Sequence, residues 1–197
     1  MKATDHYFKA YVDQGCLGRF CHERGPPPVD KQTVIRMNRD TPYSAAIFDL
    51  STPVTIIKPD TGKRFQSMLV INEDHYVKLL AHEAGSYTPT QDKIGTRYVA
   101  VAVRTFVDPN DPADIAELQQ AQDGVKVIQD SPGRVEVPDW DQNQLNGLRA
   151  AILALSPYSP SSRGSFGDVN EVDPVEHLIG AARGWGAIPR RAPPISP

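Results

Sequence analysis

The sequence predicts a mainly β chain with flanking helices, an α+β fold built on an antiparallel β-sandwich of jelly-roll-like type. Two observations favour this class. Short runs rich in β-branched and aromatic residues recur between turn signals, a spacing typical of sandwiches rather than of alternating strands and helices. Proline makes up 18 of the 197 residues, about 9% against a typical ~5%, which indicates many turns and short elements. This composition excludes a helical bundle, a coiled coil and a collagen-like rod.

The first half of the chain contains a helix followed by short strands. Apolar residues at three- and four-residue spacing predict a helix over residues 3–20. The run from Gly25 to Pro28 ends it and forms a stiff, extended connector. Strands separated by turn signals are expected at 34–37, 43–50, 54–57 and 65–72.

The stretch 98–107 gives the clearest strand signal. Val99, Val101, Val103 and Val107 share one face, and the opposite face carries Tyr98, Ala100, Ala102, Arg104 and Phe106. Because both faces are largely apolar, we expect this strand at the centre of a sheet. Arg104 then requires a carboxylate or ligand partner, since an unpaired buried charge is costly.

Three helices and one strand are expected in the second half. Asp111 and Pro112 begin a helix over 111–123, and a strand follows at 125–128. Asp139 begins a second helix over 139–155 with an apolar stripe, and Asp173 begins a third over 173–182. The chain therefore divides into three parts. These are an N-terminal helix with its proline-rich connector (1–30), one compact sandwich domain (31–186) and a proline- and arginine-containing tail (187–197).

Charge and hydropathy exclude several classes of partner. The net charge is −3 with interleaved signs, so no basic stripe exists for nucleic acid. No apolar window of ~18 residues exists to span a membrane, and the N-terminus does not resemble a signal peptide. We therefore expect a cytoplasmic protein. Cys16 and Cys21, with His22 adjacent, lack the fourth ligand of a structural zinc site, so reduced thiols are expected.

The turn at 38–43 is the first candidate site. Asn38, Asp40 and Tyr43 can face a pocket, with Arg104 as the counter-ion of Asp40. An ionised Asp40 beside arginine could bind a hydroxyl-bearing ligand or act as a weak base. The alternative interpretation is a hydrogen-bonded structural turn with a buried Asp40–Arg104 pair.

His75 is the second candidate. With Asp74 or Glu73, and with His82 or Asp40, it could act as an acid–base residue or ligate a metal. Neighbouring strand residues point to opposite faces, so convergence would require a bend, and the alternative is an ordinary polar loop end.

Two residues near the C-terminus have structural interpretations as well as functional ones. His177, beside two aliphatic residues of the third helix, is expected to be a partly buried histidine with its hydrogen bonds satisfied rather than a catalyst. Trp185 is a packing anchor or a ligand-stacking residue.

No cofactor is predicted, because the chain has no phosphate loop, dinucleotide fingerprint or HExxH motif. A small-molecule-binding domain is the leading hypothesis, since a few polar groups in an apolar setting are typical of ligand sites. A hydrolase is an alternative. Gly164-Ser165-Phe166-Gly167 lacks the spacing of the hydrolase elbow, but serine triads occur on unrelated folds. A self-associating structural module, a homo-oligomer, is the third hypothesis.

Five segments of the chain form a familiar set of motifs: VIRMNRDTPYS at 34–44, PDTGKRF at 59–65, VRTFVD at 103–108, DPVEHLIG at 173–180 and GWG at 184–186. Together they resemble an uncharacterised bacterial family, domain of unknown function 1254 (DUF1254), followed by a short DUF1214 part. The resemblance implies a β-sandwich or jelly-roll-like fold and no established reaction, although some short relatives carry the label carboxylesterase. The chain departs from the family at 187–189, where Ala-Ile-Pro replaces the usual Gly-Asn-Pro.

Overall fold

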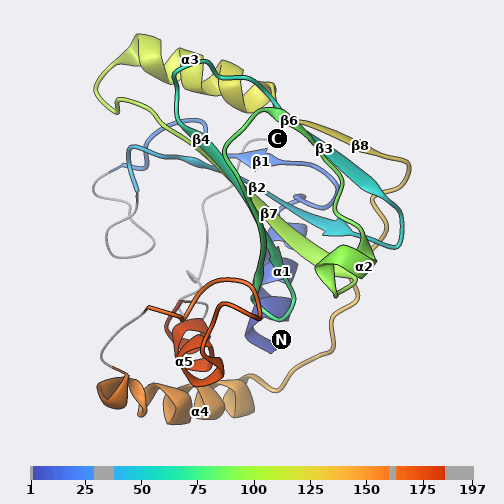
Figure 1. Ribbon diagram of the computed structural model, residues 1–197, viewed down its shortest axis with the longest axis vertical. Coiled ribbons are helices and arrows are strands. Elements are labelled where there is room, and N and C mark those ends of the chain that lie inside the picture. Colours follow the sequence, from blue (N-terminus) through green and yellow to red (C-terminus); the bar gives the residue numbers. More distant parts are fainter. Residues whose placement is uncertain (1, 29–37, 160–162, 185–197) are drawn as a thin grey trace.

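The computed structural model describes residues 2–28, 38–159 and 163–184. Within these ranges the chain forms two antiparallel sheets with helices at both ends of the strands (Figure 1). The predicted α+β class is therefore confirmed. The expected strand at 34–37 and the tail at 187–197 lie outside the described residues.

The larger sheet has five strands in the order β1-β2-β7-β4-β5. Their bounds are β1 Cys21–His22, β2 Tyr43–Asp49, β4 Gln66–Asn72, β5 Val77–Ala81 and β7 Tyr98–Thr105. As expected, β7 is the central strand, and it pairs with β2 on one side and β4 on the other.

The smaller sheet has the order β6-β3-β8. Its strands are β3 Val54–Lys58, β6 Gly85–Tyr87 and β8 Lys126–Gln129. The sequence predicted β3 and β8, but it gave no strand over either β5 or β6. β5 forms a hairpin with β4 across a short polar turn, whereas β6 pairs with the more distant β3.

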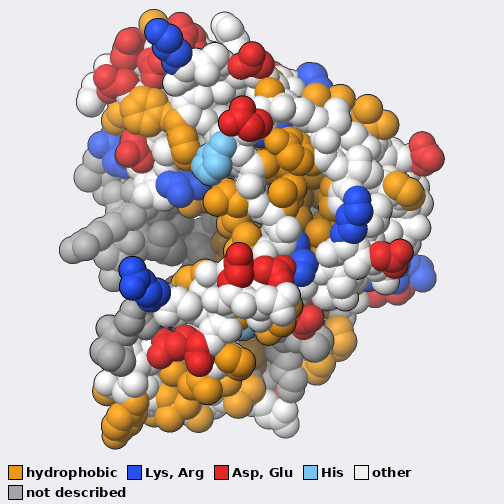
Figure 2. Space-filling view, in the orientation of Figure 1, with side chains coloured by type: hydrophobic (Ala, Val, Ile, Leu, Met, Phe, Trp, Pro, Cys, Tyr) orange, Lys and Arg blue, Asp and Glu red, His pale blue; other side chains and the backbone are white. Residues whose placement is uncertain are grey.

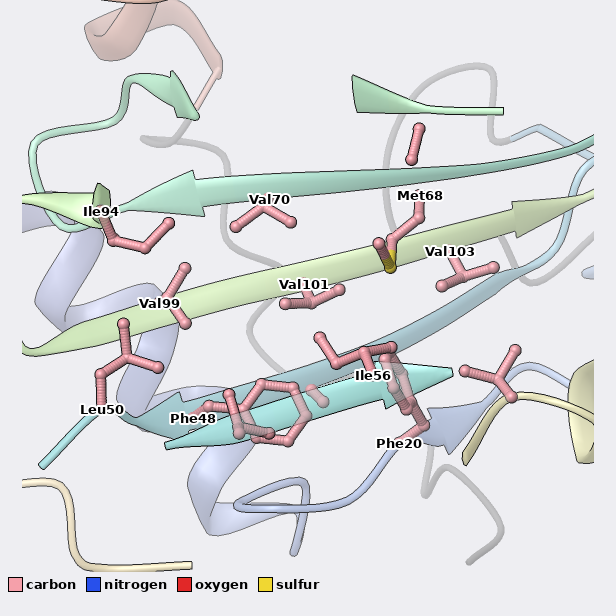
Figure 3. Packing of buried hydrophobic residues seen from close by; sticks show 14 residues of the cluster. Phe20, Phe48, Leu50, Ile56, Met68, Val70, Ile94, Val99, Val101 and Val103 are labelled. Atoms are coloured by element: carbon pink, nitrogen blue, oxygen red, sulfur yellow. The ribbon is translucent and has the colours of Figure 1, made fainter. Parts of the chain in front are cut away.

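Both sheets contribute to one apolar core. Val99, Val101 and Val103 of β7 pack with Met68 of β4, with Ile56 of β3 and with other buried residues of both sheets. Figure 3 shows these side chains in adjoining rows beside Phe20 and Phe48. The alternation of inward and outward residues along β7 thus matches the predicted faces.

Helix α1 (Lys2–Asp13) covers the opposite face of the larger sheet. Its buried Phe8 packs against Ile47 of β2 and Tyr98 of β7. The helix ends at Asp13, not at residue 20 as predicted. Gly15 and Gly18 follow with φ of 84° and 68°, a left-handed conformation that glycine adopts readily.

The early end of α1 corrects the prediction for the two cysteines. The chain turns back after the helix, and Leu17 forms a parallel bridge with Ile47. This turn brings Cys16 and Cys21 to a Cα–Cα distance of 5.5 Å, where they form a disulfide. They are therefore neither the expected reduced thiols nor zinc ligands. Both residues are buried.

A buried carboxylate holds the other end of β2. Asp49 has no exposed surface and accepts hydrogen bonds from Arg97 Nε at 3.0 Å and Arg97 Nη2 at 2.8 Å. The backbone N–H groups of Ser51 and Arg134 also donate to it. These bonds hold the pKa of the Asp49 carboxyl well below its usual range despite its burial. Gly133 approaches so closely that a Cβ there would lie 2.5 Å from the carboxylate.

The helices lie at opposite ends of the strands (Figure 1). Helix α3 (Pro112–Asp123) begins at the predicted cap, with Asp111 accepting from Ala113 N. Helix α4 (Gln142–Leu153) begins after Asp141 rather than Asp139, and α5 spans Pro174–Gly184. Short helices lie at Gln91–Ile94 (α2) and Ser156–Tyr158 (η1). No helix within the described ranges has the length and apolar character to cross a bilayer.

Helix α4 carries the predicted apolar stripe, but none of its residues is buried. The helix packs against α5, where Arg149 Nε donates to Ala182 O at 2.9 Å. Leu148 remains 53% exposed.

The disulfide predicts a measurable loss of stability on removal. Replacing both Cys16 and Cys21 with serine should lower the free energy of unfolding by about 2 kcal/mol, because the short loop then gains freedom in the unfolded chain. Urea unfolding at pH 7 measures this difference. The wild-type chain in excess dithiothreitol should match the double variant, and a reductant-insensitive wild type would contradict the pairing.

Candidate functional site

The structure brings together four of the residues singled out in the sequence. Asn38 Nδ2 donates to Tyr43 Oη at 3.4 Å, and Thr41 Oγ1 donates to Asp40 Oδ1 at 3.3 Å. Arg104 Nη2 donates to Thr41 Oγ1 at 2.8 Å, and its guanidinium carbon lies 5.4 Å from the centroid of the Tyr43 ring. The register explains the proximity, since Tyr43 is paired directly with Arg104 across β2 and β7.

The predicted ion pair between Asp40 and Arg104 is not formed. Asp40 is exposed, and its backbone O accepts from Val107 N at 2.8 Å, which fixes the turn to the end of β7. Arg104 uses the Thr41 hydroxyl in place of the Asp40 carboxylate. Its Nε is buried and has no hydrogen-bond partner in the described part of the chain. The guanidinium is therefore a partly buried cation that no carboxylate of the described residues neutralises.

Sequence reasoning missed three further residues around Tyr43. Glu23 Oε2 accepts from Tyr43 N at 3.0 Å, and burial raises the pKa of this carboxyl. The rings of Tyr7 and Tyr11 lie 5.4 Å apart on α1, and burial raises the pKa of both phenols. The tyrosines appeared in the sequence only as part of an apolar stripe, and nothing local to Glu23 indicated its position.

This arrangement is suited to binding an anionic group beside a flat ring. Arg104 supplies an uncompensated guanidinium, and arginine binds carboxylate and phosphate oxygens through its planar fork of N–H groups. The Tyr43 ring lies under that guanidinium. Asn38 supplies a neutral polar group at the same place. The fifth predicted binding residue, Trp185, lies outside the described residues.

His75 does not belong to this site. Asn72 is paired with Val99 and Ser67 with Arg104, so the turn that carries His75 lies beyond the opposite end of β7. His75 is 7% exposed, has φ of 70°, and its ring lies 5.7 Å from that of His177. Burial, with a smaller contribution from His177, lowers the pKa of His75 to about 3.

His177 holds α5 to the β4–β5 turn. Nδ1 lies 2.9 Å from Ser165 O and Nε2 lies 3.1 Å from Asp74 O, while the ring stacks on Tyr76 at 4.4 Å. The expectation of a buried histidine is confirmed. A neutral ring carries one N–H and therefore donates to one of these two carbonyls. The Ser165 hydroxyl is buried and has no hydrogen-bond partner within the described ranges. With both ring nitrogens of His177 facing backbone carbonyls, this serine and histidine do not form a nucleophile–base pair.

The histidines also do not converge on a metal. His82 follows Ala81, which is paired with Met68, so it lies at the opposite end of the β4–β5 hairpin from His75. In the described part of the chain, no three His, Cys, Asp or Glu side chains are grouped so that they could hold a metal ion.

Comparison with known proteins supports the family resemblance over part of the chain. The model of the family described as "Protein of unknown function (DUF1254)" matches residues 17–75. This range includes the turn at 38–43 and the disulfide loop from Leu17 onward. The DUF1214-like part of the resemblance stays a prediction. No curated protein matches the chain.

A solved structure shares the fold. The crystal structure of the VPA0106 protein from Vibrio parahaemolyticus has a TM-score of 0.66 and 12% sequence identity to this chain. The match covers 95% of this chain and 64% of that one. The chain described here therefore spans less than two thirds of the length of that protein.

The buried histidines predict a loss of stability in mild acid. Because burial lowers the pKa of His75 to about 3, the unfolded chain binds a proton near pH 6.5 that the folded chain does not take up. Stability from this group is complete above pH 6.5 and falls between pH 6.5 and 3. The loss at pH 5 should be roughly 2 kcal/mol at ~1.4 kcal/mol per pH unit. Burial of His22, whose pKa is lowered to about 4, acts in the same direction.

Urea unfolding between pH 7.5 and 5 measures this dependence. His75→Asn removes the titrating ring and tolerates the positive φ, so its stability should fall less steeply with acid. His6→Asn, at an exposed position of α1, is the matched control and should follow the wild type. Parallel curves for the wild type and the His75 variant would contradict the prediction.

Proposed function

We propose that this chain is a small-molecule-binding domain whose site is formed by the turn at 38–43 together with Arg104. One observation carries the proposal. Arg104 is partly buried, its Nε lacks a hydrogen-bond partner, and the described residues place no carboxylate against it. A cation removed from water without a counter-ion is costly, so a ligand that supplies the missing charge would stabilise it.

The ligand class follows from the same contacts. An anionic group, carboxylate or phosphate, would meet the free edge of the Arg104 guanidinium. Tyr43 and Asn38 offer a ring face and an amide next to it. Asp40, exposed at the rim, would favour a ligand that also carries a hydroxyl group. Trp185 as a stacking residue belongs to the proposal as a prediction from the sequence.

We also propose that the two sheets constitute a β-sandwich. In support, the inward faces of β4 and β7 share one buried cluster with β3 of the smaller sheet. A ligand site on the outer face of such a sandwich would need an additional wall, and α1 with Tyr7 and Tyr11 stands on that face.

The proposal predicts a loss of anion binding when the guanidinium is removed. Nuclear magnetic resonance titration of the ¹⁵N-labelled chain with benzoate, lactate, phenyl phosphate and inorganic phosphate should shift the signals of Tyr43 and Arg104. Arg104→Met should lower the affinity for the most tightly bound of these anions at least about tenfold, since a charged hydrogen bond is lost. Arg134→Met, at an exposed arginine, is the control. Equal binding by Arg104→Met and the wild type, or no shift with any anion, would refute the site.

Self-association is a second candidate function, favoured by the exposed face of α4 and α5. Hydrophobic side chains gather over these helices at the lower edge of the molecule (Figure 2). Leu148, Leu155, Val175 and Leu178 are each 45–58% exposed. Patches of this kind commonly mark interaction surfaces.

A second copy of the chain is the occupant that we propose for this face. A two-fold axis through it would cover the exposed apolar side chains of both copies at once.

This candidate predicts a dimer that a charge on the face disrupts. Light scattering of the wild-type chain at high concentration should give twice the monomer mass. Leu148→Glu should give the monomer mass without loss of stability, because the side chain is already half exposed. Gln144→Glu on the same helix is the charge-matched control and should stay dimeric. A monomeric wild type would refute self-association.

A further inference from the structure

A buried lysine occupies the end of the core that lies below α3. Lys58 ends β3, its side chain shares the inward face of Val54 and Ile56, and it is only 2% exposed. Nζ donates to His82 O at 2.8 Å, and within the described residues no carboxylate lies at ion-pair distance. An ammonium has three N–H groups and desolvation disfavours its charge, which is why burial lowers the pKa of Lys58.

A second buried group at this end lacks the complementary partner. Gln66 begins β4 on the inward face and is 3% exposed. Its Nε2 donates to Thr105 Oγ1 at 3.0 Å, but its Oε1 is buried and accepts no hydrogen bond from the described chain. A buried acceptor left unsatisfied costs free energy. Lys58 thus has N–H groups beyond the one that His82 O accepts, and Gln66 has an unsatisfied acceptor.

Both residues line the same cavity. It has a volume of about 230 Å³, is open to solvent on one side, and is lined by the loop that joins β3 to β4 and by the segment after β5. Asp60 and Glu83, both exposed carboxylates, stand at its rim. Arg64 also lines it, but that guanidinium is paired with Asp114 and Glu117 of α3. The cavity therefore offers a buried ammonium that donates to His82 O, a neutral acceptor and two carboxylates at its rim.

We propose that this cavity binds a small zwitterion, an α-amino acid of the size of glycine or alanine. The ligand carboxylate would meet Lys58, and the ligand ammonium would donate to Gln66 Oε1 and face the rim carboxylates. Neither an anion nor a cation alone satisfies both buried groups, whereas a zwitterion does. The volume corresponds to roughly seven or eight waters at ~30 Å³ each, which accommodates such a molecule.

The cavity is separate from the proposed anion site. Arg104 and Thr105 are consecutive in β7, so their side chains lie on opposite faces of the sheet. Gln66 contacts Thr105 on the inward face, whereas Arg104 contacts Thr41 and Tyr43 on the other. Arg104→Met should therefore leave zwitterion binding unchanged, and the failure of one proposal does not entail the failure of the other.

The test is a titration with matched single-charge compounds. Glycine and alanine, added to the ¹⁵N-labelled full chain, should shift the signals of Lys58, Gln66 and His82. Acetate and methylammonium, which carry one charge each, should bind at least about tenfold more weakly, since each leaves one buried group without its partner. If no compound shifts these signals, the cavity holds water only and the proposal is wrong. Equal binding by acetate would also overturn it.

Two variants separate binding from folding. Lys58→Met should abolish zwitterion binding, while its urea midpoint without ligand should equal or exceed that of the wild type, because an apolar side chain replaces a buried charge. Gln66→Leu should weaken binding about tenfold. Lys63→Met, at an exposed lysine of the same loop, is the control and should bind like the wild type. Undiminished binding by Lys58→Met would refute the assignment.

Discussion

The architecture depends on one strand that is apolar on both faces. β7 lies at the centre of the larger sheet, and both of its faces must be shielded from water. The smaller sheet shields one through the cluster that contains Val101, and α1 shields the other through Phe8. Each layer is therefore placed by the need to cover β7. Arg104, near the end of this strand, becomes partly buried because its neighbours along the strand are covered.

The two ends of the strands have different chemistry. At the end below α3, inward positions that hold valine and methionine elsewhere hold Ser44, Lys58, Gln66 and Thr105. Gln66 donates to Thr105 and Lys58 donates to His82 O, but Gln66 Oε1 accepts no hydrogen bond from the described residues. At the opposite end, the β4–β5 turn is joined to α5 through His177, and Lys78 pairs with Asp168. The second end holds helices in place, whereas the first leaves polar groups facing cavities.

The sequence was most informative where local pattern decides structure. The alternation of side chains along residues 98–107 predicted the central strand and both of its faces. Asp111 with Pro112 predicted the start of α3. It was least informative where partners are distant. The disulfide depends on a turn through Gly15 and Gly18 that the helical pattern of residues 3–20 obscured.

The remaining errors have the same origin. An apolar stripe does not specify what covers it, so the packing of α4 against α5 was not predictable from the stripe. At the candidate site, the grouping of Asn38, Tyr43 and Arg104 was predictable from residue type, but the replacement of Asp40 by Thr41 as the arginine's partner was not. The cytoplasmic address inferred from the sequence stays a prediction, and disulfides such as Cys16–Cys21 are rare in that compartment.

Lys58 and Arg104 illustrate why uncompensated charge is informative about function. Surface cations such as Lys9 pair with a carboxylate four residues away and lose little hydration. Such exposed pairs add little to the stability of the fold. Lys58 and Arg104 are desolvated by the layers that cover β7 and the core, yet within the described chain no carboxylate lies at ion-pair distance from either. An apolar residue at position 58 would pack there with less loss of free energy. Folding alone does not account for a lysine at this position, and the absent counter-charge is what a bound molecule would supply.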